Sequence, residues 1–149
     1  MHQNTFMTYE TMLRKAADLC VDAGEQLQAN STDANPRYEM ALRDVASKQT
    51  QLANTLARFA ETGPSELLET RVQFADDALQ PNSPQRPDSA GAALDLLRNR
   101  NALVQQAFGD CAATAAPEAL AEQLQAVADL FQAHARTLSR SLDQAWDAE

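Results

Sequence analysis

The sequence contains no isoleucine, and its 149 residues include only four glycines and 5% aromatic residues. Isoleucine and the aromatic residues are favoured in β-strands, so their scarcity argues against a sheet protein. Alanine and glutamine are abundant, and these residues, like leucine, arginine and glutamate, lose little conformational freedom on entering a helix. The composition therefore predicts an all-α fold. The length is that of one domain, which we expect to span residues 1–149.

Positive charge is also scarce. Lys15 and Lys48 are the only lysines, and 12 basic residues face 21 acidic ones, which gives a net charge of −9. Phosphate backbones are bound by clustered basic side chains, so an acidic chain without a basic stripe is not expected to bind nucleic acid. The acidic charge mainly favours solubility. A lysine-poor, alanine-rich composition is typical of a GC-rich or salt-adapted bacterial source.

The sequence shows no motif typical of a signal peptide, a membrane span or a CxxC cysteine pair. Cys20 and Cys111 form no CxxC pair, and in a chain of this size they indicate reduced, partly buried thiols of a cytosolic protein, with a disulfide as the alternative. The segment MHQNTFMTYE has no charged region followed by an apolar one, so it is not expected to be a signal peptide. No apolar run approaches the roughly 18 residues of a membrane span. We therefore expect a cytoplasmic protein without membrane association.

The chain is divided by breaks at 30–36, 61–64, 81–89 and, more weakly, 111–117. Between the breaks, apolar residues recur at steps of three and four, which indicates amphipathic helices. The first stripe begins at Phe6 and Tyr9. The segment 65–79 contains Leu68, Val72 and Leu79 on one narrow stripe and predicts a short connecting helix. The predicted helices are about 6–29, 36–61, 65–79, 89–111 and 117–146.

An internal similarity relates the two halves of the chain. With a shift of 82 residues, VASKQTQLANTLAR at 45–58 overlays VADLFQAHARTLSR at 127–140, and MLR at 12–14 resembles LLR at 96–98 with a nearly equal shift. Alanine and leucine are common, so chance similarity is the alternative to duplication. If the similarity is real, the chain consists of two helical hairpins joined by a long connection, 62–88.

Two hairpins joined by a long connection form a particular kind of four-helix bundle, in which the third helix starts at the end where the second one did. This is the topology of ferritin-like proteins. The stretch from ALDLLRNRNALVQQAF to AVADLFQAHARTLSRSL resembles the second hairpin of that superfamily, and the helical pattern covers most of the chain. The chain is thus similar to a distant ferritin-like protein, although no motif of the superfamily is intact.

The resemblance would imply a di-metal site, for which such proteins place a Glu on each of two helices and a Glu-x-x-His on each of the other two. His134 matches the histidine, but Phe131 occupies the companion Glu position and Asn101 stands where the third helix would place a Glu. The first two helices supply no carboxylate on their inner seams either. A dication needs anionic ligands, so we expect no metal, no cofactor and no catalysis of the di-metal kind.

Three polar residues interrupt otherwise apolar stripes: Gln49, Asn101 and His134. Buried polar groups need partners, so we expect these side chains to form a buried polar cluster that fixes the register of the helices. Two alternatives stay open at this point. His134 could take part in an atypical small-ligand or metal site, or it could be partly exposed at one end of the bundle.

For function, the sequence favours a non-catalytic bundle that acts through self-association, as a homodimer or a larger homo-oligomer. Surplus apolar residues lie beside the core stripes and could pack against a neighbouring helix or a partner: Met12, Leu19, Leu96, Leu103 and Leu130. The first alternative is an acidic adaptor or chaperone that holds a partner's helix in a groove. The second is the atypical ligand site near His134. No catalytic residue is predicted, because no nucleophile elbow and no glycine-rich phosphate loop is present.

Overall fold

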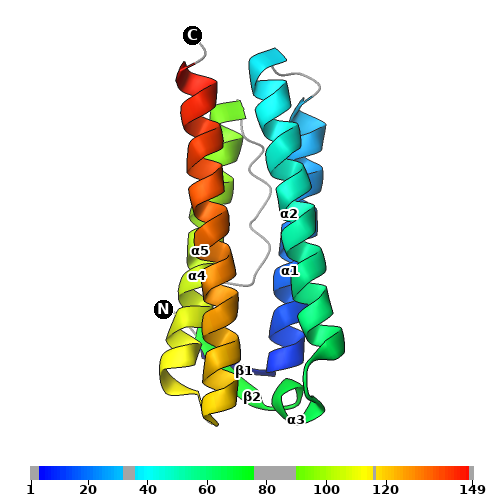
Figure 1. Cartoon of the computed structure of the whole chain (residues 1–149), viewed down its shortest axis with the longest axis vertical. Coiled ribbons are helices and arrows are strands. Elements are labelled where there is room, and N and C mark those ends of the chain that lie inside the picture. Colours follow the sequence, from blue (N-terminus) through cyan, green and yellow to red (C-terminus); the bar gives the residue numbers. More distant parts are fainter. Residues whose placement is uncertain (1–3, 32–35, 76–89, 116, 148–149) are drawn as a thin grey trace.

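The structure, a computed structural model, describes residues 4–31, 36–75, 90–115 and 117–147 (Figure 1). These residues are mostly helical, as the composition predicts, and they also contain a small sheet of two strands. The elements in chain order are β1 (Asn4–Thr8), α1 (Tyr9–Ser31), α2 (Pro36–Thr62), α3 (Ser65–Leu68), β2 (Arg71–Ala75), α4 (Ala90–Thr114) and α5 (Glu118–Asp147).

The four long helices pack in two pairs. Helix α1 lies along α2, and α4 lies along α5; the two pairs meet mainly through α2 against α5 and α1 against α4. In Figure 1, α2 and α4 both run from the top of the molecule to the bottom, whereas α1 and α5 run upward. Every helix is therefore antiparallel to both of its neighbours.

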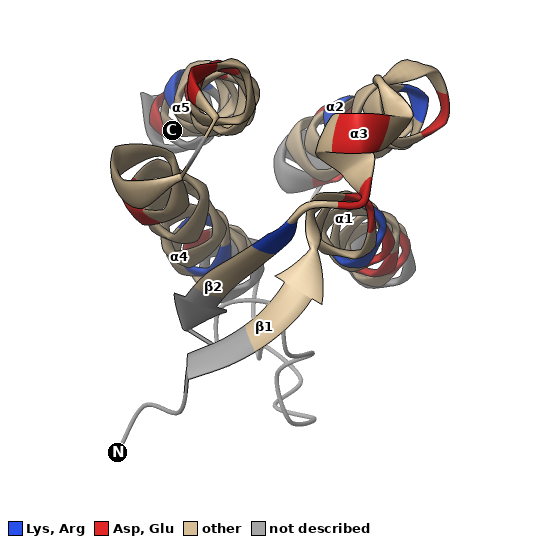
Figure 2. Cartoon of the chain, turned by 90° about the horizontal axis from the view of Figure 1, so that it is seen from below, with Lys and Arg blue, Asp and Glu red and all other residues tan. Residues whose placement is uncertain are grey.

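The two strands form an antiparallel sheet at the lower end of the molecule (Figures 1 and 2). Asn4 pairs with Ala75 and Thr8 with Arg71. At the end of β1 the Tyr9 backbone N–H donates to the Thr70 carbonyl at 2.9 Å, which continues the link between the two segments. The start of α1 is thus fastened to the chain that leaves α3.

The prediction of a helix from residue 6 is wrong at its start. Residues 4–8 are a strand, Phe6 is 64% exposed, and α1 begins at Tyr9. The helix begins there because Thr8 caps it: the Thr8 hydroxyl oxygen accepts the Thr11 backbone N–H at 3.2 Å. The apolar spacing of Phe6 and Tyr9 is therefore not part of a helical stripe.

The predicted connecting helix 65–79 is also wrong beyond its first turn. Only Ser65–Leu68 is helical, and Arg71–Ala75 is strand β2. Arg71 and Gln73 are exposed while Val72 between them is buried, which is the alternation of a strand with one covered face. Residues 76–79, including Leu79, lie outside the described part of the chain. The other predicted helices differ from α2, α4 and α5 by three residues or fewer at each described end.

The buried apolar residues form two separate clusters. The larger cluster lies toward the sheet and is built from all four long helices, α3 and β2; its largest members are Tyr9, Met12, Leu13, Phe108 and Phe131. The Phe108 and Phe131 rings stack with centroids 6.3 Å apart. The smaller cluster lies toward the other end and contains eight residues: Ala23, Leu27, Leu42, Val45, Ala46, Leu94, Leu97 and Leu138.

Candidate functional site

Four buried polar side chains lie between the two apolar clusters, and we call them the polar layer: Gln49, Arg100, Asn101 and His134. On each contributing helix the polar residue lies between a residue of the smaller cluster and a residue of the larger one. Gln49 lies between Ala46 of the smaller cluster and Leu52 of the larger one. In the same way, Arg100 and Asn101 follow Leu97 and precede Val104 on α4, and His134 follows Phe131 and precedes Leu138 on α5.

The three residues predicted to form a polar cluster are all buried, and the structure joins two of them. The Asn101 side-chain amide donates to Gln49 Oε1 at 3.1 Å, which links the diagonally placed helices α4 and α2. His134 is 8% exposed, and its Nε2 atom has no hydrogen-bond partner in the described chain. Neither amide is therefore hydrogen-bonded to His134 Nε2, and the participation of His134 in the predicted cluster stays a prediction.

Arg100 is the member of the polar layer that sequence reasoning missed. Its side chain is 8% exposed, although arginine is rarely buried without a partner. A signal was available, because Leu97, Arg100, Val104 and Cys111 follow the three-and-four spacing of a helix face. The predicted stripe runs through Asn101 and leaves Arg100 out. The Arg100 Nε and Nη2 atoms have no hydrogen-bond partner in the described chain.

The polar layer is electrostatically positive. Burial, together with the smaller effect of the nearby Lys48 ammonium, lowers the pKa of His134 to about 4, so the imidazole is neutral at pH 7. Burial raises the pKa of the Cys20 thiol to about 12, with the Arg100 guanidinium partly opposing this change. Cys20 is therefore a neutral thiol beside Arg100. No Asp or Glu is buried among the described residues.

The described residues contain no group of three or more His, Cys, Asp or Glu side chains that could hold a metal ion. Apart from His134 the layer contains two amides and a guanidinium, and these groups are hydrogen-bond donors or weak ligands for a dication. Both cysteines are free, and both are buried. In chemical terms the layer can donate hydrogen bonds to a bound group, and it contains no activated nucleophile.

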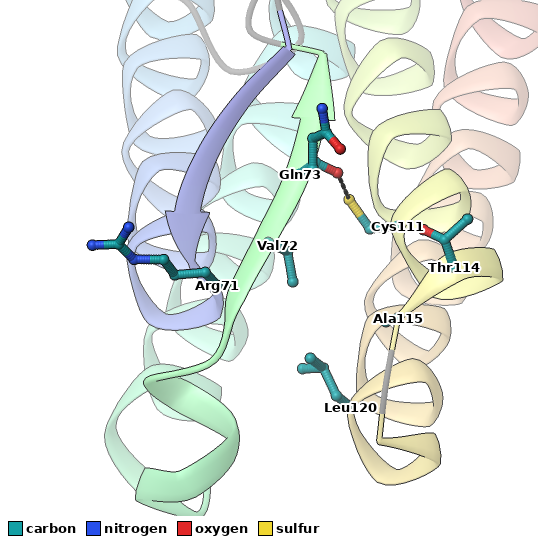
Figure 3. Close-up of a pocket in the computed structure, with 7 residues that line it drawn as sticks. All are labelled: Arg71, Val72, Gln73, Cys111, Thr114, Ala115 and Leu120. Atoms are coloured by element: carbon teal, nitrogen blue, oxygen red, sulfur yellow. Dashed lines mark hydrogen bonds between the residues drawn. The ribbon is translucent and has the colours of Figure 1, made fainter.

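A second candidate site is a cavity of about 270 Å³ between β2 and the last turns of α4 (Figure 3). It is lined by Arg71, Val72, Gln73, Cys111, Thr114, Ala115 and Leu120. The Cys111 thiol donates to the Gln73 carbonyl at 3.1 Å. The Arg71 side chain extends away from Cys111 (Figure 3). Burial and the Asp110 carboxylate raise the pKa of Cys111 to about 11, so this thiol is protonated at neutral pH and a poor nucleophile.

Comparison of the chain with protein-family models, with curated proteins and with solved structures gives no match. No helix in the described part of the chain is long and apolar enough to cross a lipid bilayer.

Proposed function

We propose that this chain is a non-catalytic four-helix bundle of ferritin-like topology that acts by self-association, and that its outer α4 surface is the interface. Two features support the topology: neighbouring helices are antiparallel, and α2 and α4 start at the same end of the molecule (Figure 1). This is the arrangement that a long connection between two hairpins produces. The interface itself is inferred from the side chains that the surface of the bundle exposes.

The observation behind the interface is the lack of charge on the outer side of α4. Between Arg98 and Asp110 the exposed side chains are Asn99, Ala102, Leu103 and Gln106, and the one charged residue of this stretch, Arg100, is buried. Leu103 is 52% exposed near the middle of the helix. Of the five surplus apolar residues in the sequence, Met12 and Leu19 are buried, Leu96 and Leu130 are half-buried, and only Leu103 is exposed.

The other long helices present charged outer surfaces. On α1 the exposed residues include Arg14, Lys15, Asp18, Asp22 and Glu25, and α2 and α5 also expose residues of both signs (Figure 2). Two copies of a chain with a net charge of −9 repel each other, so they approach best where the surface is uncharged. A second copy of this chain is therefore the partner that best fits the α4 surface.

A two-fold dimer brings the same surface of both copies together. Two α4 helices crossing near Leu103 would cover this side chain in both copies. Ala102 beside it is small, so the helix backbones could approach closely. An adaptor that holds a partner's helix would instead need a continuous apolar groove. The large hydrophobic side chains exposed in the described chain, Phe6, Val21, Met40 and Leu103, lie on four different elements.

The test is the solution mass of the wild-type chain and of two matched variants, measured by sedimentation equilibrium. Leu103→Asp places a charge in the proposed interface and is expected to weaken the dimer about 100-fold or more, because a desolvated unpaired charge costs several kcal/mol. Met40→Asp is the control, since Met40 is 77% exposed on α2, away from α4. A monomeric wild type, or equal weakening by the two variants, contradicts the proposal.

A further inference from the structure

Arg100 is a buried cation, and no buried carboxylate of the described chain balances its positive charge. A guanidinium group keeps its positive charge at all physiological pH values, so burial cannot be relieved by losing a proton. Burying an unpaired charge is costly, and buried cations are normally paired with a carboxylate or another anion. Arg100 is only 8% exposed, and its Nε and Nη2 atoms lack hydrogen-bond partners in the described chain.

Among the described residues, no buried group supplies a negative charge to Arg100. The Cys20 thiol beside it is protonated, the His134 imidazole and the two amides of the layer are neutral, and no described Asp or Glu is buried. Lys48 at the edge of the layer adds positive charge, and it is already paired with Asp44, whose carboxylate oxygen lies 2.9 Å from Nζ. The polar layer is therefore a net positive region within an acidic protein.

The remaining unpaired atoms of the layer are also nitrogens. Gln49 uses its amide oxygen to accept from Asn101, which leaves Gln49 Nε2 as an unpaired donor group at zero exposure. His134 Nε2 is unpaired as well and can carry a proton in one of the two neutral tautomers. Water could accept some of these hydrogen bonds, but it would not neutralise the charge of Arg100.

We propose that the polar layer binds one small monovalent anion, of the size of chloride or formate, at the Arg100 guanidinium. The site takes an anion because its unpaired atoms are donors and its one buried charge is positive. It takes a small anion because the apolar clusters close the layer on both sides, with Leu97 and Val104 one turn away on α4. This site is independent of the proposed dimer interface.

The first experiment uses the wild-type chain and compares its thermal unfolding in sodium chloride and in sodium gluconate at equal ionic strength. Gluconate is a much larger anion than chloride and serves as the comparison. A ligand that binds only the folded state at ten times its dissociation constant should raise the Tm by roughly 3–5 °C for a chain of this size. The gain should saturate as chloride increases. Equal Tm values in the two salts at every concentration overturn the proposal, whatever the variants do.

The second experiment detects the anion directly by the line width of the ³⁵Cl nuclear magnetic resonance signal in a protein titration. Arg100→Met should remove the excess broadening and the chloride-dependent gain in Tm. Arg98→Met is the matched control, because Arg98 is exposed on the same helix two residues earlier, and it should keep both. Unchanged broadening in the Arg100 variant, or loss of broadening in the Arg98 variant, places the chloride on the surface and contradicts the site. The dimer mass tests the interface separately.

Discussion

The two apolar clusters on either side of the polar layer differ in what they are built from. The cluster near the sheet contains large side chains, the stacked Phe108 and Phe131 rings and residues of α3 and β2. The smaller cluster consists only of alanine, valine and leucine from the four long helices. Burial of aromatic and large aliphatic side chains contributes most to stability, so the sheet end should be the more stable end.

The difference also shows what the short elements do. Leu68 of α3 and Val72 of β2 are buried in the larger cluster and cover its lower end. Gly63, between α2 and α3, allows the chain to turn tightly here, because an added Cβ would lie 2.9 Å from the Phe59 carbonyl oxygen. Regions with fewer buried apolar contacts open at lower free energy. Local opening should therefore begin at the end that contains the smaller cluster.

The largest expected effect tests this comparison with one substitution at two places on α5. Leu124 and Leu138 are both fully buried, the first in the larger cluster and the second in the smaller one. Leu124→Ala should lower the free energy of unfolding by about 4 kcal/mol and Leu138→Ala by about 2.5 kcal/mol, because we expect the smaller cluster to collapse more completely around the cavity. Urea denaturation of both variants measures the difference. Equal losses, or a larger loss at Leu138, would show that the two clusters contribute alike.

A second prediction concerns the polar layer between the clusters and its dependence on pH. The pKa of His134 is about 4 in the folded chain and about 6.5 in the unfolded one. Above pH 6.5 the imidazole is neutral in both states. As the pH falls from 6.5 to 4, the unfolded chain takes up a proton that the folded chain does not, so stability falls by on the order of 3 kcal/mol. Denaturation across this range should show this loss in the wild type.

The control for this pH dependence is His134→Leu, which removes the titrating group and keeps an apolar side chain in the core. The carboxylates titrate in both proteins, so the difference between the two stability curves isolates the imidazole. A constant difference between pH 4 and 7 would mean that His134 titrates normally and is not held in a buried environment.

The smallest expected effect separates the polar layer from the apolar clusters by their response to paired substitution. Gln49→Leu leaves the Asn101 amide buried without its acceptor and should destabilise the chain by about 2 kcal/mol. The double variant Gln49→Leu with Asn101→Leu should recover most of this loss, because no amide is left unpaired. Both are measured in gluconate, so that anion binding does not contribute. Additive losses in the double variant would show that the hydrogen bond is not the coupling between the two residues.

The four long helices could be predicted from sequence because their apolar periodicity extends over many turns, and errors at their ends are small. The strands could not. Leu68 and Val72 have the spacing of a helix face. The polar, apolar, polar order of Arg71, Val72 and Gln73 fits a strand equally well. Over so few residues periodicity does not distinguish the two, and the pairing with residues 4–8 decides the outcome. That pairing is a long-range contact, which local patterns do not encode.

Within the candidate site, Gln49, Asn101 and His134 could be identified because each interrupts an apolar stripe, and burial follows from position on the stripe. Arg100 was missed because its residue type predicts exposure, while its position on α4 places it inside. Hydrogen bonding was only partly predictable. The amide pair depends on the diagonal contact between α2 and α4, and the direction of an imidazole depends on packing that a sequence stripe does not specify.

The pairing of β1 with β2 has a consequence for the order in which the chain folds. Tyr9 and Thr70 are hydrogen-bonded, so the segment between them, which contains α1, α2 and α3, leaves and returns at one point. Closing so long a loop costs entropy that two short strands cannot offset by themselves. We therefore expect the α1–α2 hairpin to form first and the two strands to pair afterwards. The sheet thus joins the two ends of the segment that contains the first hairpin. Among the described residues, no sheet joins the ends of the α4–α5 pair in this way.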